Sequence, residues 1–279
     1  MLRLAERGHH VVATHHGHPQ PGTLPLDLTD APAVVRHIVE TEPDWVICPA
    51  GLTSVDYCES HRDEAMAANR DAPAAAARAA AERGAGFVYF STEYVFDGTA
   101  GPYREDDCVN PQSVYALSKL EGERGVVKEN PRTIVIRTTV VYGPERQGKN
   151  TVYQMLTRAA AGEPIRLPND QITSPTYNVD LAAATVELIE RDFRGLLHVA
   201  GPAVLDRYAF ALEVCAVFGL DASRVEPVET AALGQQARRP LRAGLAIDRA
   251  RDLLRTPLRT PREGLEDMRR MLEGARTHA

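Results

Sequence analysis

Tyr115 and Lys119 are the residues whose types and spacing most clearly point to chemistry. They stand four positions apart in the sequence YALSKLEGE, and positions i and i+4 of a helix share one face. A nearby ammonium favours the phenolate and so lowers a phenol pKa that is about 10 in water. Such a phenol can give a proton to a carbonyl oxygen or take one from an alcohol. The pair therefore predicts an acid–base site.

A polar segment ahead of this pair makes the prediction more specific, because Y-x-x-x-K alone is a common pattern. Residues 91–98 read STEYVFDG and follow an apolar stretch. Simpler readings stay open for each residue. Tyr115 and Lys119 would also suit a solvated helix face, Thr92 a turn cap after a strand, and Glu93 a solvated surface carboxylate.

Strand-like and helix-like segments alternate along the first half of the chain, and this predicts an α/β protein with a doubly wound parallel sheet. In such a sheet, ligands bind beyond the carboxyl ends of the strands. Polar clusters follow three of the expected strands, at 49–54, 91–93 and 138–143. We expect strands at 10–14, 44–48, 86–91, 133–137 and 196–199, and helices at 30–41, 62–83, 113–128, 151–161, 179–191 and 206–218.

The bulk composition is that of a globular protein and argues against two classes of partner. The 279 residues are 44% apolar and 25% charged, with a formal net charge of −6, so neither nucleic acid nor an anionic membrane is an expected partner. No apolar run approaches the roughly 20 residues that span a bilayer, and no signal peptide is visible. The four cysteines are widely spaced without a C-x-x-C pair, which favours a cytoplasmic protein without disulfides or zinc.

Eight motifs in the expected order resemble the extended short-chain dehydrogenases/reductases, and within them the dTDP-4-dehydrorhamnose reductases. The motifs cover nearly the whole chain and are more specific for this subfamily than for one sugar. They are LDLTD, VDYCES, STEYVFDG, GPYREDD, NPQSVYALSKLEGE, VIRTTVVYG, DQITSPTY and RRPLRAGL, beginning at positions 26, 55, 91, 101, 110, 135, 170 and 238.

This resemblance implies reduction of a 4-keto nucleotide sugar by NADPH or NADH. Tyr115 would protonate the carbonyl oxygen, and Lys119 would lower the pKa of Tyr115 and hydrogen-bond the nicotinamide ribose. Thr92 would hydrogen-bond the substrate oxygen. The remaining cofactor contacts implied by the resemblance are Asp27 and Leu28 at the adenine and Ala50, Gly51 and Leu52 at a strand-end turn.

Three further positions are implied to face the substrate. Glu93 stands where the reductases usually carry Asp, and its extra methylene would shift a contact. Val140 stands where many relatives have a Trp that faces the sugar. Arg239 would meet a diphosphate, although a surface arginine beside a helix is an equal alternative.

The histidines at 15, 16 and 18 follow the first expected strand, where the adenosine ribose would lie. No acidic residue for a ribose 2′-hydroxyl stands at this strand end, which favours NADPH, whose 2′-phosphate an acidic group would repel. An exposed polar loop is the simpler reading of these histidines. No carboxylate or cysteine completes a ligand set, so no metal is expected.

The family pattern starts with a strand and a G-x-x-G-x-x-G turn that this sequence does not contain. Residues 1–8 instead read as the end of the following helix, stopped by Gly8. Without the strand, its two neighbours would expose backbone groups and apolar surface. Either the true start lies upstream, which we favour, or the protein binds a dinucleotide poorly or not at all.

The expected organisation is a Rossmann-like cofactor domain with a smaller C-terminal substrate lobe. We assign 1–142 and 178–200 to the cofactor domain, and 143–177 and 201–279 to the lobe. The expected partner is a nucleotide sugar, and a homodimer is an open alternative to a monomer. The same motifs resemble the regulatory β subunit of methionine adenosyltransferase, which implies a second function, the binding of a partner enzyme.

Overall fold

The computed structural model describes residues 1–276, which group into two compact units. The first unit comprises Met1–Val95, Pro111–Ile136 and Thr185–Leu197. The second comprises Phe96–Asn110, Arg137–Ala184 and the chain from His198 onward. The segment 96–110 groups with the second unit.

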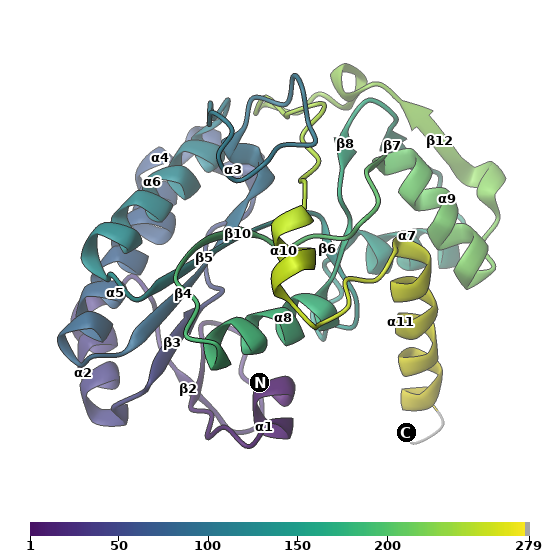
Figure 1. Cartoon of the computed structure of the whole chain (residues 1–279). Helices are drawn as coiled ribbons and strands as arrows, with labels where there is room; N and C mark the ends of the chain where they lie inside the picture. The colour runs from purple at the N-terminus through teal and green to yellow at the C-terminus, as the bar shows by residue number, and fades with distance from the viewer. Residues whose placement is uncertain (277–279) are drawn as a thin grey trace. The chain divides into compact units, whose positions relative to one another are not determined.

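A four-stranded sheet is the centre of the first unit, and it confirms the predicted α/β fold. Its strand order is β10-β5-β4-β3, and β3 and β4 are parallel. Figure 1 shows α2, α5 and α6 along one face of this sheet. The strands are β3 (Trp45–Cys48), β4 (Gly86–Thr92), β5 (Thr133–Thr138) and β10 (Gly195–His198), and the helices are α2 (Ala31–Thr41), α5 (Ala72–Glu82) and α6 (Val114–Glu129).

Side-chain caps fix where two of these helices begin. The Asp30 carboxylate accepts a hydrogen bond from Ala33 N over 3.0 Å at the start of α2. The Ser113 hydroxyl accepts one from Ala116 N over 3.2 Å at the start of α6. Each cap satisfies a backbone donor that has no partner inside its helix, so the helix that carries the Tyr115–Lys119 pair starts where the sequence predicts.

The helical stretch before α5 is interrupted in a way that the sequence did not predict. It begins with α3 (Val55–Ser60) and α4 (Arg62–Met66) and then widens into a π-helical turn, η1 (Ala67–Asp71). A π-turn displaces backbone carbonyls from the regular hydrogen-bond pattern and often marks a functional position. Here it presents Asn69, which is fully buried, toward α6 and the end of β3.

The N-terminal segment forms a sheet of its own beside these elements. After α1 (Leu2–Glu6), strand β1 (Ala13–His15) pairs in parallel with β2 (Thr23–Pro25) and, within residues 1–276, with no strand of the larger sheet. Val12 and Leu24 are 42% and 51% exposed.

The second unit is built from short strand pairs and helices around one apolar core. Strands β6 and β9 and strands β7 and β12 pair in parallel, whereas β8 and β11 are antiparallel. Its elements are β6 (Val141–Tyr142), α7 (Thr151–Ala160), β7 (Ile165–Pro168), β8 (Ile172–Thr173), β9 (Thr176–Tyr177), α8 (Asn178–Glu190, which continues into the first unit), β11 (Leu205–Asp206), α9 (Arg207–Phe218), β12 (Val225–Val228), α10 (Asp248–Leu253) and α11 (Pro261–Arg276).

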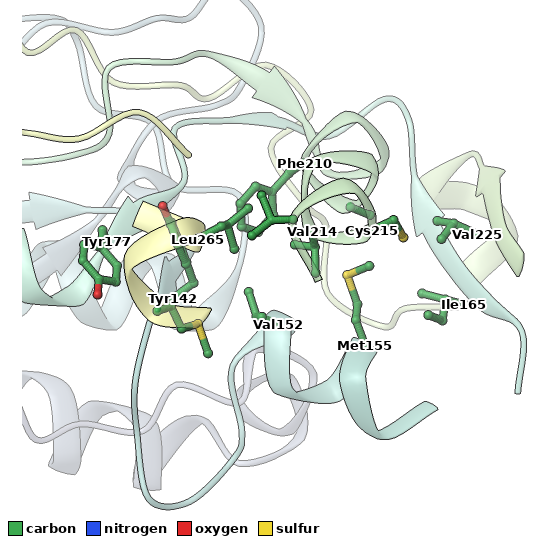
Figure 2. Packing of buried hydrophobic residues seen from close by; sticks show 13 residues of the cluster. Tyr142, Val152, Met155, Ile165, Tyr177, Phe210, Val214, Cys215, Val225 and Leu265 are labelled. Carbon is green, nitrogen blue, oxygen red and sulfur yellow. The ribbon is translucent and has the colours of Figure 1, made fainter. Parts of the chain in front are cut away.

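The core of the second unit lies around helix α9. Figure 2 shows Phe210 and Val214 of this helix directed at side chains from neighbouring elements. Phe210 lies 5.1 Å from the Tyr142 ring, centroid to centroid. Met155 of α7 and Leu265 of α11 complete the same buried cluster, so the C-terminal helix is part of this unit's core.

Candidate active site

Thr92 and Tyr115 meet at the carboxyl end of β4. Thr92 is the last residue of that strand, and Tyr115 lies in the first turn of α6. The Thr92 hydroxyl hydrogen-bonds the phenol oxygen of Tyr115. The same hydroxyl accepts a hydrogen bond from Tyr94 N over 3.2 Å. Thr92 thus closes a turn and also contacts the proton-donor candidate.

Packing around the Tyr115 phenol decides its acidity in this structure. Burial raises the pKa of Tyr115 above its ordinary value of 10.0, and the hydrogen bond from Thr92 opposes the rise. The Tyr94 ring stands edge-on to Tyr115, with centroids 5.8 Å apart. The expected lowering of this pKa by Lys119 is not found here, and the hydroxyl of Thr92 is the neighbour that favours the phenolate.

Lys119 is buried, with 6% of its surface exposed, so a solvated helix pair is not the explanation of the Tyr115–Lys119 spacing. Its Nζ lies 4.0 Å from the centroid of the Tyr89 ring. Within residues 1–276 no hydrogen-bond acceptor is recorded for this ammonium. Burial lowers the pKa of Lys119 to about 8, although the charges of Cys48 and Glu123 act to raise it. The three N–H donors of the ammonium are therefore available to a ligand oxygen.

The turn after β3 is shaped by the side chain of Asn69. Leu52 N donates to Asn69 Oδ1 and Asn69 Nδ2 donates to Leu52 O, both over 2.9 Å. A Cβ added to Gly51 would lie 2.7 Å from Asn69 Oδ1 and 3.8 Å from Lys119 Nζ. Ala50 and Gly51 are exposed, so the backbone of this turn is open to a ligand beside Lys119.

Asn69 also ties this turn to the helix of the phenol. Its Nδ2 donates to Ser118 Oγ over 2.9 Å, and Ser118 Oγ donates to the carbonyl oxygen of Tyr115 over 2.8 Å. Sequence reasoning missed Asn69 and Ser118. A polar Asn-Arg-Asp run inside an otherwise Ala-rich helix was the available signal for Asn69.

Asp27 and Leu28 lie just beyond β2 in the first unit and are partly buried. Asp27 Oδ1 accepts hydrogen bonds from Thr29 N and Thr29 Oγ1 over 2.8 and 2.7 Å. These bonds lower the pKa of Asp27. His16 Nδ1 lies 3.5 Å from the same oxygen, so Asp27 organises the loop in which an adenosine contact is expected.

The three substrate-facing candidates lie in different units. Glu93 belongs to the first unit and is 3% exposed, so it is not a solvated surface carboxylate. Val140 and Arg239 belong to the second unit. The backbone of Val140 has φ 38, a left-handed value that costs energy for a β-branched residue. Arg239 is partly buried in the segment before α10.

Residues 1–276 contain neither a candidate metal cluster nor a membrane-spanning helix. No group of three or more His, Cys, Asp or Glu side chains is placed to hold a metal ion within that range. No helix in the same range has both the length and the apolar character needed to cross a membrane.

The fold and the site together define a Rossmann-like α/β protein in which a hydroxyl and a phenol meet at the end of β4 and a buried lysine lies one helical turn from the phenol. Residues 1–273 match the RmlD substrate binding domain family. The chain belongs to this family.

Individual relatives agree with this assignment. The dTDP-4-dehydrorhamnose reductase of Mycobacterium tuberculosis is 39% identical over 86% of this chain and 80% of its own length. The crystal structure of the Bacillus anthracis dTDP-4-dehydrorhamnose reductase in complex with NADP has a TM-score of 0.83 and 30% identity, and the match covers 89% of this chain and 87% of that one. The methionine adenosyltransferase 2 subunit beta of Bos taurus is 32% identical over 90% of this chain and 78% of its own length.

Proposed function

We propose that this protein is an NAD(P)H-dependent reductase of a 4-keto nucleotide sugar, of the dTDP-4-dehydrorhamnose reductase type. The observation that carries the proposal is the contact of Thr92 with Tyr115 at the end of β4, with the buried Lys119 one turn later on the same helix as Tyr115, within a chain that belongs to the RmlD family. The reductase relatives and the NADP complex of one of them support the reaction class and a nicotinamide cofactor.

The residues at the nicotinamide end fit such a cofactor. The buried Lys119 ammonium offers donors to ribose hydroxyls, and the absence of a side chain at Gly51 lets a ligand approach the turn. Ala50 and Leu52 would line the same stretch, and Asp27 and Leu28 the adenosine end. When bound, the cofactor supplies the hydride that reduces the carbonyl carbon.

In the mechanism we propose, Tyr115 gives its phenolic proton to the carbonyl oxygen of the substrate. Thr92 hydrogen-bonds the phenol and fixes its direction, which also leaves the phenolate stabilised after the proton has left. The Lys119 ammonium adds a positive charge one helical turn away. Glu93, Val140 and Arg239 are proposed to contact the sugar and the diphosphate.

The test is turnover of NADPH with dTDP-4-keto-6-deoxy sugars, followed by the loss of nicotinamide absorbance. We expect turnover with at least one of several 4-keto sugars and a preference for NADPH over NADH. Absence of turnover across the set, in a protein that binds NADPH, would contradict the proposal.

A non-catalytic function is the second candidate, and the similarity to the methionine adenosyltransferase subunit favours it. In that case the fold would serve to bind a partner enzyme. A pull-down with methionine adenosyltransferase, together with its kinetics in the presence of this protein, separates the two functions. Neither binding nor a kinetic effect would remove the regulatory function.

A further inference from the structure

Tyr89 stands in the middle of β4 and is fully buried. Its hydroxyl donates a 2.7 Å hydrogen bond to the backbone carbonyl oxygen of Asn69. That carbonyl belongs to the π-turn η1, where carbonyls leave the regular helical pattern. The ring of Tyr89 is thereby held at both ends, by its own strand and by the π-turn.

The space for this contact depends on a glycine of α6. A Cβ at Gly122 would overlap both the Tyr89 hydroxyl oxygen and the carbonyl oxygen of Asn69. Gly122 lies three residues beyond Lys119 on the same helix. Strand β4, the π-turn and helix α6 therefore converge on the Tyr89 side chain.

The face of the anchored ring is occupied by the ammonium of Lys119, 4.0 Å from the ring centroid. An aromatic face attracts a cation and favours its charged form, most strongly where water is excluded. The other titratable groups that act on Lys119 are the Cys48 thiol on β3 and the Glu123 carboxylate on α6. Tyr115 lies one turn earlier on α6.

We propose that Tyr89 is a positioning residue for Lys119, because its ring, anchored to Asn69 by the hydroxyl, holds the Lys119 ammonium charged and in place. The proposal deepens the proposed reductase function and rests on it for the role of Lys119. The hydroxyl and the ring have separable tasks: the hydroxyl fixes the ring, and the ring face supports the charge.

The sequence offers a direct measurement of this charge, because the chain has only three lysines, at 119, 128 and 149. With the lysine ε-carbon labelled, NMR follows the titration of each, and Lys119→Arg identifies the Lys119 signal by its disappearance. The readout needs neither cofactor nor turnover. Failure of the reductase function therefore stays distinguishable from failure of this proposal.

Phenylalanine and increasingly fluorinated phenylalanines at position 89 form the decisive series. Fluorination weakens the attraction of the ring for a cation while leaving its shape nearly unchanged. We expect the Lys119 pKa to fall stepwise, by about half to one unit across the series, as the cation–π contribution is withdrawn. An unchanged Lys119 pKa across the series would overturn the proposal.

Two further variants complete the test. Tyr89→Leu removes the ring face and should lower the Lys119 pKa as far as the most fluorinated ring does. If Tyr89→Leu does not fold, the fluorinated series decides alone. Tyr57→Leu is the matched control, because Tyr57 is exposed and stacks on His61 instead of facing a lysine; a Lys119 shift of equal size in this control would contradict the assignment.

In the active enzyme, Tyr89→Phe should keep most of kcat, because the ring remains. Tyr89→Leu should lower kcat and move the alkaline limb of its pH profile toward lower pH, in step with the Lys119 pKa. A loss of kcat in Tyr89→Leu with an unmoved pH profile would indicate a merely structural role and overturn the proposal.

Discussion

Asn69 and Leu52 are joined by two hydrogen bonds, in which the side-chain amide of one satisfies both backbone groups of the other. The Asn69 side-chain amide thus makes the pair of hydrogen bonds with the turn after β3 that the backbone of a neighbouring strand would make. Its third bond, to Ser118, connects the turn to the helix of Tyr115. The proposed cofactor surface and the proton donor are therefore held by one buried side chain.

Asn69→Ala should be strongly destabilising, because it removes three hydrogen bonds of a fully buried side chain and leaves Leu52 N without its acceptor. We expect the free energy of unfolding to fall by about 2–4 kcal/mol, measured by denaturant titration. Asn169→Ala is the control, since Asn169 is exposed, and it should change stability by less than about 0.5 kcal/mol. Equal effects of the two substitutions would contradict the account of this turn.

Gly51→Ala should disturb the same turn by crowding the side chain of Asn69. The added Cβ would lie 2.7 Å from Asn69 Oδ1, and Asn69 cannot retreat because its amide is bonded at both ends. We expect a loss of about 1–3 kcal/mol in stability and an NADPH Kd at least about tenfold higher, read from a fluorescence titration.

The control for that change is Gly274→Ala, at a helical position of α11 where a Cβ would meet nothing within 4 Å. It should raise stability by about 0.5–1 kcal/mol, because alanine replaces glycine in a helix, and leave NADPH binding unchanged. An unaltered NADPH Kd in Gly51→Ala would remove the proposed contact of this turn with the cofactor.

Much of this site could be predicted from the sequence, and the reason lies in local signals. Ser113 caps α6 as its position suggests, and the apolar run before Thr92 forms β4 with its carboxyl end at the polar cluster. These features depend on neighbours along the chain, which a sequence displays directly.

The parts that were not predicted depend on contacts between distant segments. Asn69 reaches Leu52 and Ser118 across 17 and 49 positions, and helical periodicity does not reveal a π-turn. The raised pKa of Tyr115 depends on such contacts too: i, i+4 spacing places Lys119 on the same helix face, but burial is the largest influence on the phenol and the Lys119 ammonium faces Tyr89.

The buried charge of Lys119 should make stability depend on pH in a defined direction. Its pKa falls from 10.5 to about 8 on folding, so the unfolded chain binds more protons between these values and stability rises with pH across that window. The free energy of unfolding of the native protein, minus that of Lys119→Met, should rise by up to about 3 kcal/mol from pH 8 to 10.5. If the difference in unfolding free energy between the two proteins did not change with pH, Lys119 would not be desolvated in the folded state.

Glu93→Gln should make Tyr115 more acidic. Burial is the main reason for the raised Tyr115 pKa, and the Glu93 carboxylate adds to it by disfavouring a second negative charge. Removing the carboxylate charge should shift the pH profile of the Tyr115 phenolate absorbance, taken as the difference from the matching Tyr115→Phe variant, to lower pH. Glu82→Gln, at an exposed position of α5, should leave the profile where it is, and a shift in this control instead would contradict the assignment.

The most direct test of the reductase function compares Tyr115→Phe with the native protein in a single turnover of a dTDP-4-keto-6-deoxy sugar with NADPH. The substitution removes only the phenolic oxygen, so NADPH affinity should stay within about threefold. The rate of nicotinamide oxidation should fall by about 10²–10⁴-fold, the usual contribution of a positioned proton donor. Equal rates in the two proteins would contradict the assignment of Tyr115 as the proton donor.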